Sequence, residues 1–142
     1  MLKQLPLQRI AYNAIPSVVY TNPEIACIGL TEKDLNDIKE GDFAPSMSTD
    51  KPFVPYEVHK LPMTYSGRFV AENEGEIGLC KVIVDQRNKT IIGVHMIGNP
   101  CYEFVAAASF AVRMGYTVGE FKQVVFPHPT VGEVLREVIM EA

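Results

Sequence analysis

One histidine of this chain stands where a side chain could transfer a proton. His128 lies between Pro127 and Pro129, and Glu133 follows where a helical pattern begins. The charge of a histidine changes near neutral pH, and a neighbouring carboxylate favours its protonated form. The segment therefore predicts a general acid/base pair in which Glu133 orients the imidazole of His128. A purely structural interpretation, a turn residue held between two prolines, stays open.

Glu133 has a second interpretation because it follows Thr130 at the spacing of a capping box. In that motif a threonine and the glutamate three residues later satisfy free backbone N–H groups at a helix start. Such a cap would also hold the carboxylate in place, so the two roles are compatible. The His128–Pro129 peptide bond could be cis, as a minority of X–Pro bonds are.

The other residues with catalytic potential stand alone. His59 and His95 have no carboxylate at a telling spacing, and we interpret His95 as a surface or satisfied histidine in a strand. Gly93 and Gly98 have the GxxxxG spacing, but no Lys–Ser/Thr follows them. No GxGxxG occurs either, so the chain has no dinucleotide fingerprint of its own.

The cysteines form no recognisable site. Cys27, Cys80 and Cys101 are odd in number, far apart and set in apolar surroundings. They include no CxxC pair and no metal-ligand spacing, so we expect reduced, buried thiols and no metal centre. Their pattern predicts no specific role.

Composition limits the class of protein. The chain has 142 residues, of which 47% are hydrophobic and 21% charged, as in one globular domain spanning 1–142. A net charge of −4 lacks the basic stripe that nucleic-acid binding needs. The longest apolar run, Phe104 to Val112, is too short to span a bilayer, and residues 1–10 lack a secretory signal. We therefore expect a cytoplasmic protein that binds neither nucleic acid nor membrane.

Strand patterns occupy the first two thirds of the chain. Residues 15–20 and 26–30 predict short strands, and Thr31 predicts the N-cap of a helix that ends at Gly41. The segment 43–60 contains several prolines, so strands there should be broken or at a sheet edge. Residues 79–85 and 90–97 predict an antiparallel hairpin.

Helical patterns follow the hairpin. One helix begins after Asn99–Pro100 and ends at Gly115. A capping box of Thr117 and Glu120 starts a short helix over 118–123, and a second box would start a final helix that runs to about residue 141. Segregated strands and helices predict an α+β fold, an antiparallel sheet flanked by helices.

Two motifs together resemble a known family. The segment 20–32, YTNPEIACIGLTE, resembles the entry segment of the C-terminal dimerisation domain of pyridine nucleotide-disulfide oxidoreductases. His128-Pro129-Thr130 with Glu133 resembles the active-site signature that closes that domain, and residues 91–98 fit its hairpin strand. The resemblance covers about residues 12–142 and is greatest to dihydrolipoyl dehydrogenases. Departures include Phe126–Pro127 where those enzymes often carry His-Ala, and Gly132 in place of a usual serine.

The resemblance implies a function that the chain performs only as part of an assembly. In a parent chain, FAD and NAD domains precede this domain, and the redox cysteine pair lies in the FAD domain. His128 is expected to protonate and deprotonate the dithiol substrate, with Glu133 as its partner, at the active site of the other subunit of a homodimer. A 2-oxoacid dehydrogenase-type complex is a further expected partner. The isolated chain is expected to hold no cofactor and to be inactive.

Two alternatives remain. The chain could be a non-catalytic dimerisation module that keeps the histidine motif for its turn and cap, or part of a glutathione or mercuric reductase. The enzyme interpretation predicts that the reading frame upstream of Met1 encodes a GxGxxG and a CxxxxC.

Overall fold

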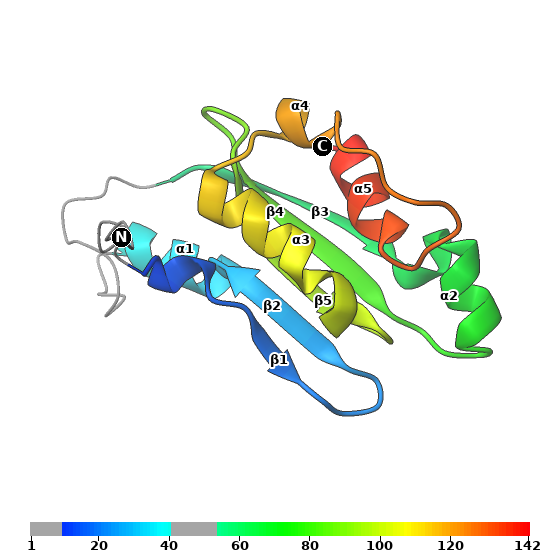
Figure 1. Ribbon diagram of the computed structural model, residues 1–142. Helices are drawn as coiled ribbons and strands as arrows, with labels where there is room; N and C mark the ends of the chain where they lie inside the picture. The colour runs from blue at the N-terminus through cyan, green and yellow to red at the C-terminus, as the bar shows by residue number, and fades with distance from the viewer. Residues whose placement is uncertain (1–9, 41–53) are drawn as a thin grey trace, which may run out of the picture.

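The structure, a computed structural model, describes residues 10–40 and 54–142. Five antiparallel strands form one sheet in the order β1-β2-β5-β4-β3 (Figure 1). Their bounds are Ser17–Val19 (β1), Ile25–Gly29 (β2), Tyr56–Pro62 (β3), Leu79–Asp85 (β4) and Ile91–Ile97 (β5). The expected α+β class, an antiparallel sheet with helices, is confirmed.

The central hairpin sets the register of the sheet. β4 and β5 pair from Leu79 opposite Ile97 to Val84 opposite Ile91, with one irregularity after Ile83. The turn between them closes where the N–H of Asp85 donates to the carbonyl of Thr90, at 2.8 Å. The predicted hairpin is therefore confirmed. β3 lies at the sheet edge, as the prolines of the segment 43–60 predicted, whereas residues 43–53 of that segment lie outside the described residues.

The described residues include five α-helices. They are α1 (Glu32–Glu40), α2 (Gly67–Glu72), α3 (Cys101–Met114), α4 (Val118–Phe121) and α5 (Glu133–Met140). Short 3₁₀ turns cover Tyr12–Ala14 and Met63–Tyr65. α3 ends at Gly115, whose φ of 67° is the left-handed conformation that favours glycine. α2 has no counterpart among the expected elements, and the expected helix stop at Gly41 lies outside the described residues.

The core lies between the sheet and two helices. α3 and α5 lie side by side on one face, α3 over β2 and β5, and α5 over β3 and β4 (Figure 1). Because strand side chains alternate between faces, every second residue of β2, β4 and β5 enters this core. Buried members include Ala26, Ile28, Cys80, Val82, Val84, Val94, Met96, Val105, Ala108, Val134, Leu135 and Val138.

The opposite face of the sheet carries α1. Lys81 lies between the core residues Cys80 and Val82 on β4, so its side chain points to that opposite face. There its Nζ lies 3.2 Å from the carboxylate of Glu32 on α1. Among the residues that the structure describes, no helix is both long enough and apolar enough to cross a membrane.

Candidate active site

The loop between α4 and α5 presents His128 to solvent. Nδ1 of His128 lies 2.8 Å from Oε1 of Glu133, the first residue of α5. The imidazole side chain is 81% exposed, whereas the side chain of Glu133 is only 21% exposed. The His128–Pro129 peptide bond is cis. The contact that the sequence spacing predicted is therefore present, with the carboxylate held in the protein and the imidazole turned outward.

The Glu133 carboxylate uses its two oxygens for different partners. Oε1 faces His128, and Oε2 accepts a 2.8 Å hydrogen bond from the backbone N–H of Thr130. The Thr130 N–H is the main reason that the pKa of Glu133 lies below its ordinary value, and the His128 imidazole lowers it further. Partial burial acts in the opposite direction and is outweighed. Glu133 is therefore an ionised acceptor at neutral pH.

The second predicted capping box forms only in half. The glutamate bonds the backbone of Thr130, but the Thr130 hydroxyl donates to the carbonyl of Pro127 at 2.8 Å. The helix begins after Gly132, which contributes no side-chain cap. The prediction of a complete box was wrong because the Thr130 hydroxyl closes the loop around His128 instead.

α4 shows the complete form of the same pattern. The hydroxyl of Thr117 accepts the N–H of Glu120, and one oxygen of Glu120 accepts both the N–H and the hydroxyl of Thr117. The predicted capping box at Thr117 and Glu120 is thus confirmed. Each cap uses one carboxylate oxygen, and only the second oxygen of Glu133 has an imidazole beside it.

The pair has the geometry of a general base. An ionised carboxylate accepts a hydrogen bond, so Nδ1 of His128 carries the proton in this contact. In the neutral ring Nε2 is then the basic nitrogen. Within the described part of the chain, Nε2 of His128 makes no hydrogen bond. An outside donor can therefore reach it.

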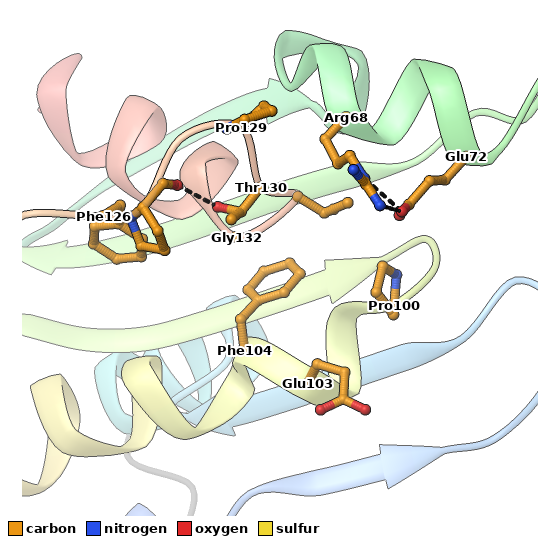
Figure 2. A pocket seen from close by; sticks show the side chains of 11 residues that line it. Arg68, Glu72, Pro100, Glu103, Phe104, Phe126, Pro129, Thr130 and Gly132 are labelled. Atoms are coloured by element: carbon orange, nitrogen blue, oxygen red, sulfur yellow. Dashed lines mark hydrogen bonds and ion pairs between the residues drawn. The ribbon is translucent and has the colours of Figure 1, made fainter.

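A groove of about 510 Å³ lies behind the loop, between the starts of α2, α3 and α5 (Figure 2). Figure 2 shows Phe104 of α3 pointing from one wall toward the loop, and Arg68 paired with Glu72 on α2. Gly132 packs against Phe104, since a Cβ built at Gly132 would lie 3.3 Å from the Cβ of Phe104. The lining comprises Arg68, Glu72, Pro100, Glu103, Phe104, Phe126, Pro127 and residues 129–132, so the imidazole lies outside it.

The other histidines differ from His128. Nε2 of His95 donates to the carbonyl of Leu30 at 2.9 Å, and burial lowers the pKa of His95, so the interpretation as a satisfied histidine holds. His59 corrects the sequence interpretation. Its Nε2 lies 3.4 Å from Oε2 of Glu57, two positions away on the same face of β3. That carboxylate has a closer partner in Nζ of Lys89, at 2.7 Å.

The cysteines are free thiols, with Cys80 and Cys101 buried and Cys27 half-buried. Burial raises the pKa of Cys80 to about 12 and that of Cys101 to about 11, which makes both poor nucleophiles at neutral pH. Across residues 10–40 and 54–142, no three His, Cys, Asp or Glu side chains converge as metal ligands. Gly93 lies within β5, not in a strand-to-helix turn that could hold a phosphate.

Sequence reasoning missed Ser66. Its hydroxyl caps α2 by accepting the N–H of Phe69, and it also donates to the carbonyl of Thr130 at 2.9 Å. A serine before a short helix is an N-cap signal, but no glutamate or glutamine stands at position 69 to complete a capping box. The bond to Thr130 joins residues 64 positions apart, and no local pattern predicts it.

The chain matches the family model of the pyridine nucleotide-disulphide oxidoreductase dimerisation domain over residues 15–139. It is 35% identical over 133 residues to a mitochondrial dihydrolipoyl dehydrogenase of Caenorhabditis elegans, covering 94% of this chain and 24% of that protein. A dihydrolipoyl dehydrogenase of Thermus scotoductus is 36% identical over 123 residues, 87% of this chain and 23% of that protein. The chain thus spans about a quarter of the length of these relatives.

Solved structures share the fold. LpdA from Mycobacterium tuberculosis superposes with a TM-score of 0.76 at 21% identity, over 95% of this chain and 26% of that one. The HOCl-induced flavoprotein disulfide reductase RclA from Escherichia coli gives 0.72 at 19% identity, over 89% and 26%. Fold, family model and sequence relatives agree, and the chain belongs to the dimerisation-domain family of the pyridine nucleotide-disulfide oxidoreductases.

Proposed function

We propose that this chain is the dimerisation domain of a dihydrolipoyl dehydrogenase-type enzyme and supplies the acid/base pair for dithiol oxidation. The observation that carries the proposal is the exposed imidazole of His128, held through Nδ1 by the carboxylate of Glu133. The names of the relatives favour a dihydrolipoyl substrate over glutathione, and NAD⁺ is the electron acceptor proposed with it. We propose a homodimer in which His128 serves the active site of the partner subunit.

The step assigned to this chain is a proton transfer. A thiol attacks a disulfide only as its thiolate. Nε2 of His128 takes the proton of the substrate thiol, leaving the thiolate, while the Glu133 carboxylate stabilises the imidazolium through Nδ1. In the reverse direction the imidazolium returns the proton. General acid/base catalysis of this kind contributes about 10²–10⁴-fold in rate.

The cofactors belong to the proposed parent enzyme and not to this domain. Within the described ranges, 10–40 and 54–142, the chain has no glycine-rich strand-to-helix turn that fits a dinucleotide phosphate. FAD and NAD are accordingly assigned to the two other domains of the parent chain. They supply the electron transfer, and this chain's residues handle the proton.

Mixed dimers of the parent enzyme test whether the site forms between subunits. One parent variant carries His128→Ala, and the other lacks a redox cysteine of the FAD domain, so each is inactive alone. If the histidine serves the partner, each mixed dimer has one complete site, and random mixing restores about a quarter of wild-type activity. If His128 serves its own subunit, mixing restores nothing. A fully active His128→Ala parent contradicts the proposal altogether.

A further inference from the structure

Ser66 connects α2 to the histidine loop through a single hydroxyl. Its side chain is nearly inaccessible, with the residue 3% exposed. The oxygen accepts the backbone N–H of Phe69 at 3.2 Å, and the hydroxyl donates to the carbonyl of Thr130 at 2.9 Å. Both hydrogen-bonding capacities of the group are therefore used, one within its own helix and one across to the loop.

Thr130 links Ser66 to the His128–Glu133 pair through hydrogen bonds. Its carbonyl is held by Ser66, its hydroxyl donates to the carbonyl of Pro127, and its N–H donates to Oε2 of Glu133. Three hydrogen bonds thus fix one residue that lies directly between Ser66 and Glu133. The other oxygen of Glu133 contacts His128. A continuous chain of hydrogen bonds runs from the start of α2 to the imidazole.

The matching threonine of α4 needs no such anchor. At Thr117 the hydroxyl accepts the N–H of Glu120, and the box closes on itself. At Thr130 the hydroxyl is directed to Pro127, so that closure is missing. The bond from Ser66 supplies the restraint that the incomplete box lacks.

We propose that Ser66 is a positioning residue for the His128–Glu133 pair. By holding the Thr130 peptide, its hydroxyl keeps the Thr130 N–H aimed at Glu133 and so directs the free carboxylate oxygen to the imidazole. The inference rests on the proposed function for its catalytic consequence, but its structural part concerns this chain alone.

Three substitutions separate the anchor from the helix cap. Ser66→Gly removes the hydroxyl but keeps a residue that is tolerated at an N-cap, so it costs little as a cap. Ser66→Thr keeps a hydroxyl and serves as the conservative rescue. Thr117→Ala removes the cap of α4 and leaves the Ser66–Thr130 bond untouched, so it controls for general loss of stability.

The direct readout is the titration of the Glu133 carboxyl carbon, followed by ¹³C NMR in the 142-residue chain. The Thr130 N–H is the largest cause of the lowered pKa of Glu133, and the other charged neighbours, His128 and Arg136, are present in every variant. In Ser66→Gly we expect this pKa to rise toward its ordinary value. In Thr117→Ala and in Ser66→Thr, the Glu133 carboxyl should titrate as it does in the wild type. An unchanged Glu133 titration in Ser66→Gly overturns the inference.

Activity in the parent enzyme tests the consequence separately. Loss of a residue that orients a metal ligand typically costs about 10–100-fold in activity. By analogy, Ser66→Gly should lower dithiol turnover about tenfold, with recovery in Ser66→Thr. A shifted Glu133 titration with unchanged turnover would refute the catalytic part of the role. Failure of the proposed function itself shows differently, as full dithiol turnover in His128→Ala, whatever Glu133 does in Ser66→Gly.

Discussion

At the scale of single residues, two identical sequence patterns give two different sites. Thr117 with Glu120 and Thr130 with Glu133 share the same spacing, and both glutamates accept the backbone N–H of their threonine at 2.8 Å. The difference lies in the threonine hydroxyl, which closes the box in α4 but turns to Pro127 in the loop. That hydroxyl bond closes the loop around His128, whose Nδ1 lies 2.8 Å from the second oxygen of Glu133.

The pKa of Glu133 gives a pH-dependent prediction. It is lower in the folded chain than in the unfolded chain, mainly because of the Thr130 N–H, so the carboxylate stabilises the fold above about pH 4.3. That contribution is lost as the pH falls through the lower, folded pKa. Glu133→Gln removes the titration, so its melting temperature should lie below that of the wild type at pH 7 and converge with it in acid. Thermal melts across this pH range measure the difference.

Glu120→Gln is the matched control for that variant. Its carboxylate also has a lowered pKa, caused first by the Thr117 N–H, so its stability should follow pH in the same direction. In the parent enzyme, Glu133→Gln should reduce dithiol turnover, though less than His128→Ala, whereas Glu120→Gln should not. Equal turnover in the two glutamine variants would leave Glu133 with a capping role only.

How much of the site the sequence predicts depends on the range of each contact. The His128–Glu133 contact was predictable because it spans five positions and a helix start fixes the second residue. The half-formed box was not, because the same spacing permits two hydroxyl partners. The Ser66–Thr130 hydrogen bond could not be predicted from the sequence, because it depends on how α2 packs beside the loop.

At the scale of elements, α5 positions the site by packing on the sheet. It contacts β3 and β4, and its own residues Val134, Leu135 and Val138 are completely buried against the sheet. Glu133 lies at the first turn of this helix, where the helix dipole favours a negative charge. The carboxylate is therefore placed by the core as much as by the loop.

Removing one core side chain of α5 should be costly. Leu135→Ala deletes a side chain with 0% exposure, and such changes typically destabilise by about 2–5 kcal/mol. Val125→Ala, at a residue 91% exposed, should change the free energy of unfolding by less than about 0.5 kcal/mol. Urea unfolding of both variants makes the comparison. Similar stabilities would show that α5 does not anchor to the sheet as described.

The close contact between Gly93 of β5 and the end of β2 gives a second prediction about the sheet. A Cβ built at this glycine would lie 2.1 Å from the carbonyl oxygen of Leu30, which also accepts the bond from His95. Gly93→Ala must displace backbone, so it should destabilise the chain by about 1–3 kcal/mol. Gly119→Ala in α4, whose nearest neighbouring atom is 3.9 Å away, should not destabilise it. Thermal melts that rank the two variants in the opposite order would contradict the close approach of β2 and β5.

The elements that sequence patterns predicted are those with strong local signals. The hairpin of β4 and β5 has two β-rich runs around a polar turn, and α3 has an apolar stripe ended by Gly115. α2 was missed because its six residues begin with Gly67 and are too few to show a helical period. β1 is shorter than expected, three residues, because only Ser17–Val19 pair with β2.

At the scale of the whole molecule, the site faces outward. The imidazole of His128 is 81% exposed, and the groove behind the loop does not include it. Among the described residues the imidazole hydrogen-bonds only with Glu133, so the proposed role in the partner's active site fits a dimerisation domain. The two dihydrolipoyl dehydrogenases compared above are about four times as long as this chain.

If His128 moves the substrate proton, its loss should show first in rapid kinetics of the parent enzyme with His128→Ala. The two half-reactions are measured separately, flavin reduction by the dithiol and flavin reduction by NADH. We predict that the dithiol half-reaction slows by about 10²–10⁴-fold while the NADH half-reaction is nearly unchanged. A dithiol half-reaction that proceeds at the wild-type rate in His128→Ala would contradict the account.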